Sequence, residues 1–170
     1  MNGTVLDILI YVFDRYMFDE APEVPERDVL ARDLESAGFG EANVERALDW
    51  LADLAGERNR PALFRPGEPG EAADTGRRRD LPLRVYSPQE LARLSAECRG
   101  LLMSLEHAEI LSPLQREIVI DRLLALDADD LNIEQVKWVV LMVLSSQPGQ
   151  ELACARMETL VFEADESAAH

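Results

Sequence analysis

The sequence is poor in the residues that usually carry catalysis and metal binding. Lys137 is the only lysine, and the two histidines, His107 and His170, lie far apart. Neither histidine has a cluster of further ligands near it in the sequence, so no metal site is predicted. Neither a phosphate-binding glycine motif nor the G-x-S-x-G motif of hydrolases is present. We therefore expect a protein that is not an enzyme and binds no cofactor.

Cysteines and long apolar stretches are also scarce. Cys98 and Cys154 form no C-x-x-C pair, which excludes a disulfide framework and fits a reducing compartment. The longest apolar run, residues 136–144, contains Lys137 and is far shorter than the roughly 20 residues that cross a bilayer. The apolar N-terminus contains Asp7 and has no basic region, so no signal peptide is predicted. These features indicate a cytoplasmic protein without membrane contact.

What the chain has in excess is negative charge. Its formal net charge is -16, from 17 basic and 33 acidic residues. The residues before Tyr86 include 11 basic and 18 acidic side chains, and those after it include 6 and 15. Neutralisation of phosphates by cations supplies most of the non-specific affinity for nucleic acids, so this charge disfavours nucleic acids and anionic membranes as partners. The partner that the charge favours is a protein, and a basic one best.

Hydrophobic periodicity predicts a mainly α fold, and its first unit is expected to span residues 1–86. This unit would hold three helices, at residues 5–18, 26–37 and 41–54. A short β-hairpin could follow, pairing residues 62–64 with 83–86 across a loop rich in proline, glycine and arginine at 56–80. That order of elements is typical of a winged helix, so the first unit is predicted to be winged-helix-like.

The second unit, residues 87–166, is expected to be a bundle of four helices packed on the first, with 167–170 as a tail. Ser87 and Ser112 each precede a proline and begin a capping box, the pattern that starts a helix. Asn132 with Gln135 begins a third helix in the same way.

Two side chains within these helices could carry chemistry, but a structural role is favoured for both. Cys98 lies on the apolar stripe of its helix, where a free cysteine behaves as a small buried hydrophobe. Lys137 stands beside Trp138 near a helix start, where we expect it to pair with Asp130 or Glu134.

The surface predicted to bind a partner is the helical hairpin of residues 26–54 together with the adjacent loop, with Gly38 as the cap between the two helices. Arg99 is a further candidate for a partner contact. Gly100 follows it within a helix, where glycine lowers helix stability by about 1 kcal/mol relative to alanine. A glycine kept at such a position suggests that another backbone approaches closely. Arg99 could hold a carboxylate of this chain, which is favoured, or of a partner. The predicted partner contacts are Phe39, Glu41, Glu45, Asp49, Trp50 and Arg99.

An alternative is a winged-helix module that binds DNA through its arginine-rich loop. The contacts would then be Arg77, Arg78, Arg79 and Arg84. Against this alternative, the third helix would read the major groove, and it displays mostly acidic residues that repel phosphates.

Several long segments also resemble one protein family. They include VLDILIYVFDRY at 5–16, AGF and ALDWL within 34–54, RVYSPQELARLSAECRG at 84–100, REIVIDRLLALD at 116–127, VKWVVLMVL within 136–149 and METLVF at 157–162. These segments cover most of the chain and resemble the Smg proteins of proteobacteria, whereas the 66–80 loop departs from that pattern. The resemblance implies a protein of unknown function with no catalytic residues to carry over. Genes of this family often neighbour genes for DNA-processing proteins, so the resemblance implies a link to DNA processing.

Together, charge and resemblance predict a non-enzymatic interaction or adaptor protein. The oligomeric state is not predicted by the sequence.

Overall fold

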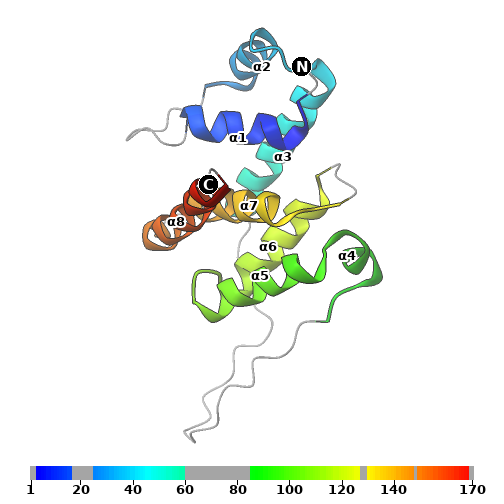
Figure 1. Cartoon of the computed structure of the whole chain (residues 1–170). Helices are drawn as coiled ribbons and strands as arrows, with labels where there is room; N and C mark the ends of the chain where they lie inside the picture. The colour runs from blue at the N-terminus through cyan, green and yellow to red at the C-terminus, as the bar shows by residue number, and fades with distance from the viewer. Residues whose placement is uncertain (1–2, 17–24, 60–84, 127–129, 148, 169–170) are drawn as a thin grey trace, which may run out of the picture.

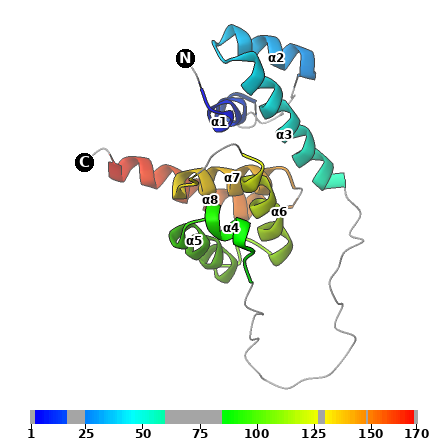
Figure 2. The same cartoon turned by 90° about the vertical axis from the view of Figure 1, so that its right-hand side faces the viewer.

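The computed structural model describes residues 3–16, 25–59, 85–126, 130–147 and 149–168. In these residues the chain forms helices and no strand, which confirms the mainly α fold. The helices are α1 (Val5–Tyr16), α2 (Arg27–Ser36), α3 (Glu41–Asn59), α4 (Pro88–Arg93), α5 (Ala96–His107), α6 (Pro113–Leu124), α7 (Ile133–Ser145) and α8 (Glu151–Ala168). Helices α1 to α3 lie together above α4 to α8 (Figures 1 and 2).

The three helices predicted for the N-terminal unit are confirmed. Helix α1 is apolar on most sides because it packs against both α3 and α7. Gly38 lies two residues past the end of α2, and its φ of 99° is a conformation that glycine adopts readily. The amides of Gly38 and Phe39 donate to the carbonyls of Glu35 and Leu34, at 3.0 and 3.2 Å, which is a Schellman cap. The cap turns the chain sharply into α3.

The winged-helix unit and its β-hairpin find no support in the described residues. Residues 62–64 lie outside them, as does most of the 56–80 loop. Val85 and Tyr86 are described and belong to no strand, and 89% of the surface of Val85 is exposed. Helix α3 also continues beyond residue 54 to Asn59, so it takes the first residues of the expected loop.

The C-terminal unit holds five helices in its described part, where the sequence predicted four. The helix that begins at Ser87 stops at Leu94, which is extended (φ -102°, ψ 112°) and forms a parallel bridge with Leu131. Ser95 then starts α5, because its side chain accepts a hydrogen bond from the amide of Cys98 at 3.2 Å. The capping boxes predicted at Ser87, Ser112 and Asn132 are confirmed.

Helix α7 lies at the centre of the molecule, in contact with α1, α5, α6 and α8 (Figures 1 and 2). Its residues from Val139 to Leu144 are all buried. The ring of Trp138 packs edge to face against Phe13 of α1 and Phe162 of α8, with ring centroids 6.2 and 6.1 Å apart. Trp138 thus links the first and last helices. The two units therefore share one continuous core.

The end of α6 is a second junction between the units. The last carbonyls of a helix have no partner within it, and two side chains from other helices supply donors here. Trp50 of α3 donates its Nε1–H to the carbonyl of Arg122 at 2.9 Å. Arg93 of α4 donates to the carbonyls of Leu124 and Leu126. Helices α3 and α4 are thus both fixed to the same turn of α6.

Candidate functional site

The two side chains that could carry chemistry have structural roles. Cys98 is fully buried, and its Sγ donates to the carbonyl of Leu131 at 3.3 Å. Lys137 pairs with Glu134, Nζ to Oε1 at 3.1 Å, as predicted. Across the part of the chain that the structure describes, no three His, Cys, Asp or Glu side chains are grouped so as to hold a metal ion. None of the described helices is long and apolar enough to cross a bilayer.

The predicted partner surface on α2 and α3 is partly occupied by contacts within the protein. Glu41, Glu45 and Asp49 lie exposed along α3. Arg27 of α2 reaches two of them, with one guanidinium nitrogen 2.8 Å from both Asp49 Oδ1 and Glu45 Oε2. The hydrogen bond to Asp49, and to a smaller extent the one to Glu45, stabilises the charged guanidinium and raises the pKa of Arg27 above its ordinary value. Part of the negative charge on this face is therefore neutralised by the fold itself.

The aromatic side chains predicted for the same surface lie deeper than the carboxylates. Phe39 is half-buried, with its ring edge to face with Tyr11 at 5.5 Å. Trp50 is 3% exposed, and its ring lies 5.9 Å from the guanidinium carbon of Arg122. Trp50 is therefore a core residue that offers little surface of its own to a partner.

Arg99 and Gly100 differ from expectation. No described residue lies within 4 Å of a Cβ built on Gly100, so the described part of the structure does not support the prediction that another backbone approaches it. Arg99 lies over the ring of Tyr86, 5.7 Å from its centroid, and pairs with no carboxylate among the described residues. The four arginines of the alternative, Arg77, Arg78, Arg79 and Arg84, lie outside the described residues.

Most cations whose side chains are described are engaged within the fold. Their partners are carboxylates, main-chain carbonyls or aromatic rings. These cations are Arg15, Arg27, Arg93, Arg99, Arg116, Arg122 and Lys137. Carboxylates outnumber them and are mostly exposed, so the outward field of the described part is negative.

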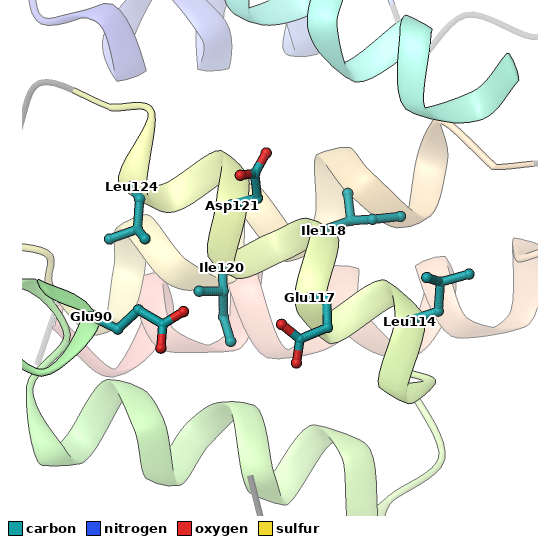
Figure 3. A pocket seen from close by; sticks show the side chains of 7 residues that line it. All are labelled: Glu90, Leu114, Glu117, Ile118, Ile120, Asp121 and Leu124. Atoms are coloured by element: carbon teal, nitrogen blue, oxygen red, sulfur yellow. The ribbon is translucent and has the colours of Figure 1, made fainter. Parts of the chain in front are cut away.

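The structure also shows a hollow that the sequence did not predict, along the outer face of α6 beside α4 (Figure 3). Its volume is about 350 Å³. We call it the α6 groove, and it is lined by Glu90, Leu114, Glu117, Ile118, Ile120, Asp121 and Leu124. Leu114 is 60% exposed, and Ile118 and Leu124 are half-buried. The groove therefore has a partly open apolar floor.

Three carboxylates surround this floor. Glu117 lies 3.1 Å from Arg116 and Asp121 lies 2.9 Å from Arg122, and their side chains remain 46% and 65% exposed. Glu90 closes the capping box of α4, since its Oε2 accepts from the amide of Ser87 at 2.8 Å. In Figure 3, Glu90 and Glu117 point to either side of Ile120, and Asp121 projects from the other edge of the same face of α6. The groove thus combines apolar and anionic groups.

A signal for the α6 groove does exist in the sequence. Positions 114, 117, 118, 121 and 124 follow the spacing of one helix face. Val119 and Leu123, on the other side of α6, are fully buried. A helix with apolar residues on two faces could be central or could carry a binding face, and only the packing of the other helices decides which.

Comparisons with known proteins agree with the resemblance seen in the sequence. Residues 5–170 match the family described as "Protein of unknown function (DUF494)". The "Protein Smg homolog" of Xanthomonas oryzae pv. oryzae is 44% identical over 162 residues, 95% of each chain. The protein of the same name from Methylococcus capsulatus is 42% identical over 163 residues, 96% of each chain. The one from Stenotrophomonas maltophilia is 43% identical over 162 residues, 95% of each chain. No solved structure matches the chain. With the family match and these relatives covering almost the whole length, the chain belongs to the Smg family.

Proposed function

We propose that this protein is a non-enzymatic adaptor whose acidic surface binds a basic protein partner. The proposal rests on one observation: most of the described cations make contacts within the fold, whereas most of the described carboxylates face solvent. A further part of the proposal, that the partner acts in DNA processing, rests on the family resemblance.

Long-range electrostatics support this proposal. A surface with a strong negative field attracts a cationic protein before contact, which raises the association rate and makes it sensitive to salt. The same field repels the phosphates of nucleic acids and anionic lipids. The DNA-binding alternative depends on Arg77, Arg78, Arg79 and Arg84, and no contact of the described residues favours it.

A capture experiment tests the proposal. The full-length protein is immobilised and incubated with native bacterial lysate at low and at high salt, and the bound proteins are identified by mass spectrometry. We expect a small set of basic proteins at low salt and their loss at high salt, because screening weakens surface electrostatics. A parallel mobility-shift assay with duplex DNA is expected to show no shift.

Two results would contradict the proposal. Recovery of no specific protein at either salt concentration would remove the adaptor role. A DNA shift that disappears when Arg77, Arg78 and Arg79 are all replaced by alanine would favour the DNA-binding alternative instead.

A further inference from the structure

We infer that the α6 groove binds a basic amphipathic helix of a protein partner, with its apolar side on the groove floor and its cations at the three carboxylates. This inference rests on the proposed adaptor function and assigns a site and a partner chemistry to it. The juxtaposition that carries it is a row of partly exposed apolar side chains on α6 between Glu90, Glu117 and Asp121.

The apolar floor has the length and spacing that a helix recognises. From Leu114 to Leu124 the outer face of α6 extends about 15 Å, which is close to three helical turns. Leu114, Ile118 and Leu124 lie along that face and are only partly covered. Single exposed apolar residues are ordinary on a protein surface, but several that line one hollow are typical of a contact surface. A partner helix would fill it with side chains at positions i, i+3 or i+4, and i+7.

The charges on the same face indicate the sign of the partner. Glu117 and Asp121 lie four residues apart on α6, a like-charge spacing that destabilises an isolated helix by about 0.2–0.5 kcal/mol. Arg116 and Arg122 offset part of this cost, yet the side chains of Glu117 and Asp121 remain 46% and 65% exposed. Lysine or arginine side chains on a docked helix would neutralise them.

The helices that form the groove are held in place by contacts within the protein itself. Arg93 holds α4 to the end of α6 through the carbonyls of Leu124 and Leu126. Gln115 holds the start of α6 to the end of α7, with Nε2 2.8 Å from Gln147 Oε1. A preformed surface loses little conformational freedom on binding, which favours affinity.

Charge also argues against other occupants. A second copy of this chain would bring its own acidic helices to an acidic groove. The exposed large apolar residues in the described part of α8, for example, are Leu152, Leu160 and Phe162, and Glu151 and Glu163 stand beside the first and the last of them. Phosphate backbones and anionic lipid headgroups carry the same sign as the groove. The basic helix is the occupant that matches both parts of the surface.

A labelled peptide tests the inference. The probe is a synthetic helix of about 18 residues, with leucine along one face and lysine elsewhere. Its binding to the full-length protein is followed by fluorescence anisotropy at low salt. The groove variants are the pair Glu117→Gln with Asp121→Asn, which removes charge at constant shape, and Leu114→Gln, which removes apolar contact at constant charge. The matched control is the pair Asp14→Asn with Glu35→Gln, which changes net charge equally on the exposed surface of α1 and α2.

We expect the groove charge pair to raise the peptide Kd about fivefold, as two rim ion pairs would. Leu114→Gln should raise it by a similar factor, and the control pair by less than about twofold. Far-UV circular dichroism checks that every variant keeps its helices.

If the groove pair and the control pair weaken peptide binding equally, the inference is overturned, because the attraction would then come from net charge alone. A wild-type protein that captures basic proteins from lysate but not this peptide would also overturn it, with the adaptor function left standing. Failure of the adaptor function itself would appear as no capture from lysate.

Discussion

At the scale of single residues, the two thiols should differ sharply in reactivity. Cys98 is fully buried, whereas Cys154 is half-buried on α8. Burial, and then the charges of Glu158 and Glu151, raise the pKa of the Cys154 thiol. A raised pKa means less thiolate at a mildly alkaline pH, and the thiolate is the form that reacts. We expect iodoacetamide to alkylate Cys154 more slowly than glutathione at about pH 8, and to leave Cys98 unmodified in the native protein.

Mass spectrometry of timed samples measures both rates. The rate at Cys154 should increase as pH rises toward its raised pKa, and urea should expose both thiols. Native labelling of Cys98 as fast as that of Cys154 would contradict the burial described for α5.

Burial of single residues was predictable where a helix shows it by its own pattern. Cys98 lies on a clear apolar stripe, so its burial followed from periodicity. Trp50 lies three residues after Ala47 and four before Leu54, at the edge of the apolar stripe of α3, and it also contacts Arg122, 72 residues further along the chain. The spacing within α3 places Trp50 near the buried face, but no pattern within α3 contains the contact with Arg122.

At the scale of helices, one substitution should have opposite effects at two glycines. Gly38 ends α2 with a φ of 99°, which an alanine adopts only at a cost of about 1–2 kcal/mol. Gly100 lies inside α5 on an exposed face, where an added methyl group would meet none of the described residues. Alanine there should stabilise the protein by about 0.5–1 kcal/mol, because it favours the helix and restricts the unfolded chain.

Urea unfolding of Gly38→Ala and Gly100→Ala, followed by circular dichroism, measures the two changes in the free energy of unfolding. Each variant serves as the control for the other, since both add the same methyl group. Destabilisation by Gly100→Ala would mean that a neighbour does approach this face of α5.

The ends of most helices were predictable from local chemistry, and one break was not. Ser87, Ser112 and Asn132 begin helices through side chains that lie next to the helix they cap. The break between α4 and α5 falls within an apolar stripe that looks continuous in the sequence. It exists because Leu94 leaves the helix to pair with Leu131, a contact between distant segments.

At the scale of the whole molecule, the α6 groove was hidden from the sequence for a related reason. Both faces of α6 carry apolar residues, and the sequence does not say which face the other helices will cover. Packing on α3, α5 and α7 buries one face and leaves Leu114, Ile118 and Leu124 on the other. A binding surface formed by what stays uncovered depends on the complete fold.

The contact between Trp50 and α6 should set how firmly the N-terminal helices are held to the rest of the molecule. Trp50→Phe keeps an aromatic ring but removes the Nε1–H that the carbonyl of Arg122 accepts at 2.9 Å. The carbonyl is then left buried without that donor, so the free energy of unfolding should fall by about 1–3 kcal/mol. The control is Tyr16→Phe, which removes a surface hydrogen bond to Asp33 and should cost less than about 0.5 kcal/mol.

Circular dichroism and the fluorescence of Trp138, the one tryptophan left in Trp50→Phe, follow the same urea titration. Trp138 lies between Phe13 and Phe162, so its signal reports whether α1 stays docked on α7. Because the two units share one core, we expect the two transitions to coincide at a lower urea concentration. Equal stability of Trp50→Phe and Tyr16→Phe would show that the bond to Arg122 does not hold the units together. A Trp138 transition that precedes the loss of helix would show that α1 to α3 separate from the bundle before it unfolds.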